Sequence, residues 1–169
     1  MLTVLSNWRG YLELTKPGVQ ALLFVSCVSG MLIGADFNPP ITVLVFGLIG
    51  ISFLAASSAV INHFFDQKID AKMNRTSSRP LVIGDISSQH AIIFSILLYV
   101  SGSWMLLNFT NFLTWLLTTL TFIFYGFIYT RYLKFMTSQN IVIGGLAGAM
   151  PPLLGWTAVT NTIEPNALL

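Results

Sequence analysis

The chain has 169 residues, of which 54% are hydrophobic and only 8% are charged. Soluble domains carry roughly 25% charged residues and disordered chains carry few apolar ones, so this composition excludes both classes. A single cysteine excludes a disulfide scaffold and a zinc cluster, and a net charge of +2 without a basic run argues against a nucleic-acid binder. The remaining class is all-α: a polytopic bundle of membrane helices.

Five stretches are apolar and long enough for a helix to cross a bilayer, which takes about 20 residues. In chain order they are Val19–Ala35, Ile41 to about Phe65, His90–Leu107, Phe112–Tyr129 and Ile141–Val159. Pro17 stands at a helix-start position before the first stretch, and Asn108–Asn111 is the expected turn between the third and fourth. Pro151 and Pro152 are expected to break or kink the fifth. We expect residues 1–169 to form one domain or part of one.

The basic residues predict how these spans are oriented. All of them fall in the N-terminal arm and in the loops after the second and fourth spans: Arg9, Lys16, Lys68, Lys72, Arg75, Arg79, Arg131 and Lys134. Because cytoplasmic loops carry an excess of Lys and Arg, that side of a five-span topology is expected to be cytoplasmic. Further spans follow the first one at once, and no Ser- and Arg-rich leader precedes it, which indicates the inner membrane of a bacterium rather than a secreted or imported protein.

A polar segment at the end of the second span carries the most chemical information. Asn62, Asp66 and Asp70 are four residues apart, so on a helix each lies about 6 Å further along and only about 40° around the axis. Two carboxylates and an amide on one face suit Mg²⁺, which prefers oxygen ligands and is usually bound by one or two carboxylates together with the phosphates of a substrate.

Four basic residues lie among and behind these acids: Lys68, Lys72, Arg75 and Arg79. Guanidinium groups grip phosphate oxygens, so acids beside bases at a membrane surface indicate a metal-bridged diphosphate, whose hydrocarbon chain the apolar spans would hold. Asp66 and Asp70 also fit a simpler interpretation as surface ion pairs with Lys68 and Lys72, each worth under about 1 kcal/mol. The spacing by itself leaves both interpretations open.

Three blocks of sequence carry a family resemblance. They are Tyr11-Leu-Glu-Leu-Thr15-Lys16-Pro17, then Asn62-x-x-x-Asp66-x-x-x-Asp70-x-Lys72-Met73-x-Arg75-Thr76-x-x-Arg79-Pro80-Leu81, and last Tyr129-Thr130-x-x-Leu133-Lys134 with Gly148-Ala149-x-Pro151-Pro152. Together they resemble the protohaem IX farnesyltransferases (haem O synthases), a branch of the UbiA-type intramembrane prenyltransferases. The Asp-rich motif is shared across the superfamily, whereas its Arg-Thr-x-x-Arg-Pro-Leu continuation and the Pro-Pro block point to the haem branch.

The resemblance implies transfer of a farnesyl group from farnesyl diphosphate to a vinyl group of haem b, with water adding at the adjacent carbon, which gives haem O and diphosphate. It implies Mg²⁺ held by Asn62, Asp66 and Asp70, with haem b as a substrate. The implied catalytic residues are Asp66, Asp70, Arg75 and Arg79, and the implied substrate-binding residues are Asn62, Lys72, Arg75, Arg79, Lys134, Tyr129 and Lys16. The implied partners are the lipid bilayer and haem A synthase or terminal oxidase assembly factors.

The resemblance covers only the first half of the family pattern. The family carries a second Asp-rich loop and a later histidine-bearing segment that this chain lacks, and Phe135 stands where many relatives have a basic residue. We therefore expect the chain to be an N-terminal half that holds half of the magnesium site and is inactive alone.

Several residues keep two interpretations. His63 and His90 suit either haem contact or helix packing and capping, and Arg131, with Lys134, suits either an anionic ligand or a topology anchor. The glycines at 30, 34, 144, 145 and 148 are expected to allow close helix packing. Alternative functions are prenylation of an aromatic or quinone precursor, and a non-catalytic transport or assembly role. A transporter would place ionisable groups in mid-membrane, and no formally charged residue lies inside the predicted spans.

Overall fold

The computed structural model describes residues 7–136 and 139–164, and these residues form helices joined by short turns and one long loop. The elements are α2 (Trp8–Leu14), α3 (Pro17–Gly34), η1 (Val43–Gly47), α4 (Leu48–Asp70), α5 (Ser88–Phe109), α6 (Phe112–Ile123), η2 (Phe124–Leu133), α7 (Lys134–Met136) and α8 (Asn140–Thr160). The π-helical segment η1 runs directly into α4, and the π-helical segment η2 continues α6. The described part of the chain therefore holds five helices that are long and apolar enough to cross a membrane. This confirms an all-α membrane bundle.

The sequence explains most helix ends. Pro17 occupies the first turn of α3, where a missing N–H costs nothing. Ser87 caps α5 by accepting the backbone N–H of His90, and Asn111 caps α6 by accepting that of Thr114. Helix α4 continues to Asp70, beyond Phe65 where the expected span ends, and this extension carries the Asp-rich motif on helix.

Helix α8 corrects one expectation. It runs unbroken from Asn140 to Thr160 with Pro151 and Pro152 inside it, so the predicted break is wrong. Membrane helices tolerate proline where neighbouring helices and cavities accommodate the freed backbone groups. Pro151 is buried and lines a cavity described below.

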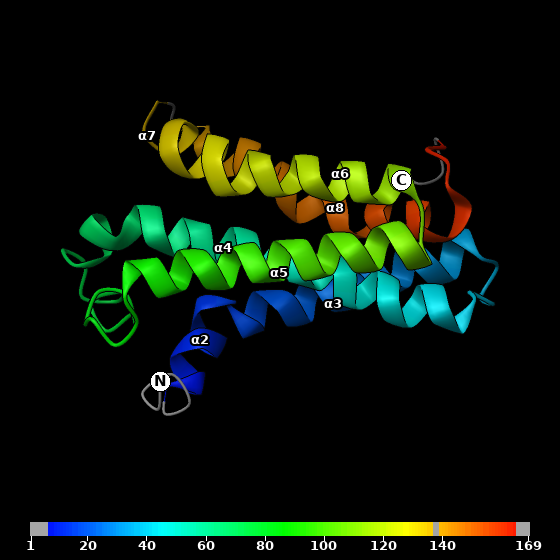
Figure 1. Ribbon diagram of the computed structural model, residues 1–169. Coiled ribbons are helices and arrows are strands. Elements are labelled where there is room, and N and C mark those ends of the chain that lie inside the picture. Colours follow the sequence, from blue (N-terminus) through cyan, green and yellow to red (C-terminus); the bar gives the residue numbers. More distant parts are fainter. Residues whose placement is uncertain (1–6, 137–138, 165–169) are drawn as a thin grey trace.

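The helices lie side by side with their connections gathered at two ends (Figure 1). The long loop from Asp70 to Ser88, the short helix α7 and helix α2 lie at one end, which we call the motif end. The turns after α3 and α5 lie at the other end. All the basic residues therefore belong to the motif end, as the alternating topology requires.

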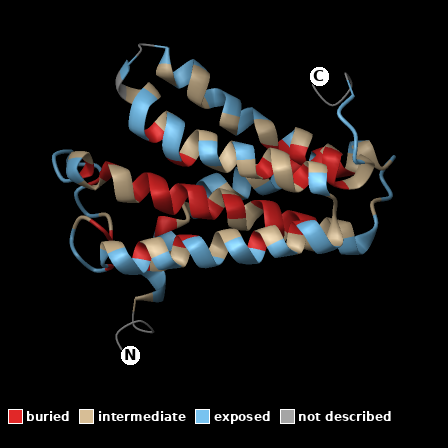
Figure 2. Cartoon of the chain, turned by 45° about the horizontal axis from the view of Figure 1, so that its top comes forward, coloured by how far each residue is buried: buried red, intermediate tan, exposed pale blue. Residues whose placement is uncertain are grey.

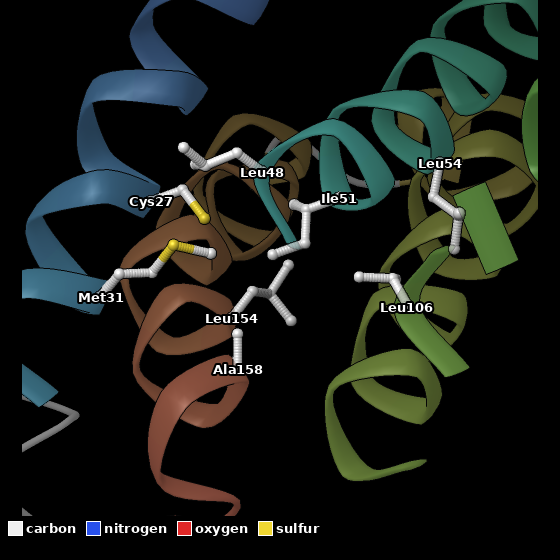
Figure 3. Packing of buried hydrophobic residues seen from close by; sticks show 8 residues of the cluster. All are labelled: Cys27, Met31, Leu48, Ile51, Leu54, Leu106, Leu154 and Ala158. Carbon is white, nitrogen blue, oxygen red and sulfur yellow. The ribbon is translucent and has the colours of Figure 1, made fainter. Parts of the chain in front are cut away.

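Helix α4 is the centre of the bundle, and it is buried along most of its length (Figure 2). Helix α5 packs along α4, and α8 packs along α3. The apolar core joins four helices (Figure 3), with Cys27 and Met31 from α3, Leu48, Ile51 and Leu54 from α4, Leu106 from α5, and Leu154 and Ala158 from α8. Burial of α4 places the motif at the end of the most enclosed helix.

Glycines decide how closely α3 and α8 approach. A Cβ on Gly30 would overlap the carbonyl oxygen of Pro152, and a Cβ on Gly155 would overlap that of Cys27. The three glycines near the start of α8 differ in how closely they are packed. A Cβ on Gly144 would meet the ring of Tyr129, whereas no heavy atom lies within 4 Å of the position of a Cβ on Gly145 or Gly148. The predicted packing role thus holds for Gly30, Gly34 and Gly144 but not for Gly145 and Gly148, since a Cβ on Gly34 would meet Val159 of α8 at 2.9 Å.

Candidate active site at the motif end

The three oxygen-bearing side chains of the motif lie on consecutive turns of α4. Asn62, Asp66 and Asp70 are only 5%, 4% and 4% exposed, which is unusual for charged residues at a helix end. Buried carboxylates need counter-charges or hydrogen bonds, and each of these acids has both.

Segment η2 supplies the first partners, in register with α4. Asn62 Nδ2 donates to Thr130 Oγ1 at 3.0 Å and to Asp66 Oδ2 at 3.0 Å. One turn further along both helices, Lys134 Nζ donates to Asp66 Oδ2 at 3.0 Å. The hydroxyl of Thr130 donates to the carbonyl of Tyr125, so its oxygen is free to accept from the amide.

Lys16 reaches the same amide from the opposite side. Its Nζ lies 2.5 Å from Asn62 Oδ1 and 3.2 Å from the hydroxyl of Tyr125. The residue adopts a left-handed backbone (φ 56°) between α2 and α3. Burial, and then the charge of Arg79, lower the pKa of Lys16 from 10.5 to about 8. An anion bound beside Lys16 would therefore favour its protonated form.

The long loop supplies the partner of the third residue. Arg79 Nη1 lies 2.5 Å from Asp70 Oδ2, and the hydroxyl of Thr76 donates to the backbone carbonyl of Asp70 at 3.1 Å. Gln67 Nε2 donates to the carbonyl of Leu81 at 2.7 Å, which ties the returning loop to α4. The loop thus folds back so that its second arginine meets the last acid.

Not every residue implied by the resemblance joins this cluster. Lys72 and Arg75 are exposed, and neither forms a hydrogen bond or ion pair with the acids in the described part of the chain. Tyr129 stacks on Tyr125 with ring centroids 5.7 Å apart and packs against Gly144 of α8, so it lies beside the cluster rather than in it.

The two histidines lie outside the cluster. His63 is buried, and neither ring nitrogen has a hydrogen-bond partner, but it lines neither of the two cavities described below. His90 is exposed in the first turn of α5, where its backbone N–H is capped by Ser87. These placements favour the packing and capping interpretations.

The cluster fits a magnesium–diphosphate ligand better than a metal alone. No group of three His, Cys, Asp or Glu side chains lies together within residues 7–136 and 139–164. Asn62, Asp66 and Asp70 provide one amide and two carboxylates. Mg²⁺ typically takes only a few ligands of this kind from the protein when phosphate oxygens complete its coordination shell. The ammonium and guanidinium groups of Lys16, Lys134 and Arg79 suit the phosphates.

An apolar cavity of about 340 Å³ opens from this cluster into the bundle. Lys16 and Tyr125 line its motif end, and Ile51, Pro151 and Leu154 line its deep end. Its walls come from α3, α4, α6 with η2, and α8: Thr15, Val19, Gln20, Leu22, Leu23, Ser26, Ala55, Ser58, Ala59, Thr118, Thr121, Phe122, Gly144, Ala147 and Gly148. From Asn62 to Ile51 the helix rises roughly 16 Å, so the cavity accommodates an extended hydrocarbon chain whose head lies at the cluster.

Residues 23–169 match the UbiA prenyltransferase family. The chain belongs to that family. It is 50% identical over 167 residues to a protoheme IX farnesyltransferase of Hahella chejuensis, covering 99% of this chain and 56% of the relative. It is 52% identical over 163 residues to protoheme IX farnesyltransferase 2 of Pseudoalteromonas atlantica, covering 96% and 53% respectively. The chain therefore spans about half the length of the curated relatives it matches.

Solved UbiA-type structures share the fold. One, from work on digeranylgeranylglyceryl phosphate synthase in membranes, superposes with a TM-score of 0.81 at 26% identity, covering 90% of this chain and 53% of that one. A UbiA homologue from Archaeoglobus fulgidus bound to GPP and Mg²⁺ gives a TM-score of 0.74 at 22% identity, covering 94% and 58%. UbiA folds are membrane-embedded, and this chain is an integral membrane protein.

Two residues that hold the cluster in place could not be predicted from the Asp-rich motif alone. Thr130 and Tyr125 hold Asn62 and Lys16 in place, yet both lie in an apolar stretch that reads as an ordinary span. The available signal is spacing: Thr130 lies four residues before Lys134, as Asn62 lies four before Asp66. Gln67, which ties down the loop, carries no comparable signal.

Proposed function

We propose that the complete protein transfers a farnesyl group from farnesyl diphosphate to a vinyl group of haem b, with one water molecule adding its hydroxyl at the adjacent carbon, to give haem O and diphosphate. One observation carries the proposal: the buried cluster of acids and cations adjoins an apolar cavity, because Lys16, which is hydrogen-bonded to Asn62 and Tyr125, also lines that cavity. The charged cluster suits a diphosphate head group, and the apolar cavity suits a prenyl chain. The identity of about 50% to protoheme IX farnesyltransferases supports haem b as the acceptor.

The motif side chains would hold Mg²⁺ through the Asn62 amide oxygen and the carboxylates of Asp66 and Asp70. When bound, the metal supplies Lewis-acid charge to the diphosphate oxygens. Lys134 and Arg79 each form an ion pair with one of these acids. Both cations would therefore lie close to the negative charge that develops on the departing diphosphate. Fixed positive charge at that position stabilises the leaving group in the transition state.

Water exclusion is the second task of these helices. Ionisation of an allylic diphosphate leaves a carbocation that bulk water would quench to an alcohol. The cavity wall is mostly aliphatic and aromatic, and its hydroxyls are short ones such as Ser26, Thr118 and Thr121. Oriented packing of the chain in this wall would hold its reactive carbon toward the motif end.

The remaining parts of the proposal concern placement in the cell. The concentration of basic residues at the motif end supports a cytoplasmic orientation of that end in a bacterial inner membrane. Lys72 and Arg75, exposed beside the cluster, are proposed to contact diphosphate only when substrate is bound. Haem O would pass to haem A synthase or to a terminal oxidase under assembly.

Product analysis tests this function directly. Membranes containing the complete protein, supplied with farnesyl diphosphate, haem b and Mg²⁺, are expected to accumulate haem O, measured by liquid chromatography with mass spectrometry. A prenylated quinone precursor without haem O would replace the proposal with the other UbiA-type chemistry. No prenylated product from either acceptor would favour a non-catalytic role.

Filling the cavity is expected to change which prenyl diphosphate is used. Ala55 lines the cavity midway between the cluster and Ile51. Ala55→Phe in the complete protein is expected to lower the ratio of farnesyl to geranyl transfer by at least about tenfold, because a mismatch of one or more methylenes already costs that much in a hydrophobic pocket. Competition between the two diphosphates, read by product mass, measures the ratio.

The control is Ala21→Phe, which adds the same ring at an exposed position of α3 that does not line the cavity. An unchanged product ratio in Ala55→Phe, together with normal turnover, would show that the prenyl chain lies elsewhere.

A further inference from the structure

A second cavity lies on the other side of α4, between α5 and η2. It has a volume of about 360 Å³ and is lined by Ser57, Ile61, Phe64, Phe65, Ile92, Ser95, Ile96, Tyr99, Phe122 and Phe127. We call it the α5–η2 groove. Phe122 lines both cavities, so its ring is part of the wall that separates them.

The polar groups of the α5–η2 groove are already engaged. Ser57 Oγ donates to the carbonyl of Ser95 at 2.8 Å, and the two hydroxyls lie 2.8 Å apart. The hydroxyl of Tyr99 lies 3.3 Å from that of Thr119. An occupant therefore needs no hydrogen-bonding groups within the groove, which favours a hydrocarbon chain.

Aromatic rings form a continuous wall along the groove. Phe64 and Phe65 have centroids 5.4 Å apart, and Phe65 and Phe127 have centroids 5.9 Å apart. Phe127 and Phe122 follow at 5.8 Å, and Phe122 and Tyr99 at 4.9 Å. These contacts hold the rings as a fixed apolar surface.

The motif-end mouth of this groove is positively charged. The guanidinium of Arg131 stands 5.5 Å from the centroid of the Phe65 ring, and Lys68 lies one turn beyond Phe64 on the exposed side of α4. The acids nearest in sequence face the other way, since Asp66 is bound by Lys134 and Asp70 by Arg79. The charge at the mouth thus suits an anionic head group.

We infer that the α5–η2 groove binds an anionic phospholipid, with one acyl chain against the aromatic wall and the phosphate at Arg131 and Lys68. A prenyl diphosphate is not the expected occupant, because none of Asn62, Asp66, Asp70 and their cationic partners lines this groove.

Lipid retention tests the head-group contact. The full chain is extracted from nanodiscs of equal phosphatidylglycerol and phosphatidylcholine, and retained lipids are counted by native mass spectrometry. Arg131→Gln is expected to lower the retained phosphatidylglycerol-to-phosphatidylcholine ratio about fivefold, the change that corresponds to about 1 kcal/mol per basic side chain near a membrane surface. Arg9→Gln, which removes an exposed arginine on α2, is the charge-matched control.

A second pair of variants tests the acyl-chain contact. Ile96→Trp fills the groove and is expected to reduce total retained lipid severalfold, whereas Leu97→Trp, on the next exposed position of α5 outside the groove, leaves it unchanged. Equal ratios in Arg131→Gln and Arg9→Gln, equal retention in the two tryptophan variants, or displacement of phosphatidylglycerol by haem b would each overturn the inference. None of these measurements uses a prenyl diphosphate, so their failure is distinct from failure of the proposed transferase function.

Discussion

Asp66→Asn in the complete protein is expected to abolish haem O formation while leaving membrane insertion intact. An asparagine preserves an oxygen that accepts from Lys134 and from Asn62, so the buried cluster keeps its shape. The substitution removes the negative charge that would hold the metal, and loss of electrostatic stabilisation of this kind costs about 10²–10³-fold in rate. Asp70→Asn, which leaves Arg79 without its counter-charge, is expected to act in the same direction.

Haem extracted from membranes and separated by liquid chromatography measures the product, and the amount of protein in the membrane fraction measures insertion. Asp36→Asn is the matched control, because Asp36 is exposed at the opposite end of the bundle and its left-handed backbone (φ 48°) accepts asparagine. Normal haem O levels in Asp66→Asn would remove the metal-binding role from the motif.

Gly155→Ala and Gly30→Ala are expected to be the two most destabilising glycine-to-alanine changes in the described bundle. In Gly155→Ala, the added Cβ would overlap the carbonyl oxygen of Cys27 and lie 3.0 Å from the backbone nitrogen of Met31. Both obstacles are backbone atoms, so α3 and α8 must separate along the contact that joins them. We expect a loss of about 3 kcal/mol in the free energy of unfolding, the upper end of the usual range for overpacking, and the same for Gly30→Ala, whose Cβ would overlap the carbonyl of Pro152.

The thermal unfolding midpoint in detergent, followed by circular dichroism, measures this effect. Gly145→Ala gives a prediction of opposite sign on the same helix, because nothing lies within 4 Å of its Cβ position and alanine is favoured over glycine in a helix by about 1 kcal/mol. Equal midpoints for Gly155→Ala and the unsubstituted chain would show that α3 and α8 do not make this contact in the membrane.

The outline of the site was predictable from local pattern. Asn62, Asp66 and Asp70 share a helix face because four residues make slightly more than one turn, and this holds wherever that helix packs. The choice among the seven residues implied for substrate binding was not predictable in this way. Lys16 and Arg79 meet the motif only because α2 and the long loop fold back on α4, whereas Arg75, four residues before Arg79, remains exposed.

The sequence by itself determined the environment and the chemistry of this protein. Charge-poor apolar runs leave no fold but spanning helices, since a bilayer satisfies no backbone hydrogen bonds, and the motif's helical spacing aligns its oxygens. Only the tertiary structure decided which side chains complete the site and where a chain-shaped cavity opens. The pairing of Thr130 and Lys134 with Asn62 and Asp66 depends on the relative register of two helices 68 residues apart, and that register is set by packing across the bundle rather than by periodicity within either helix.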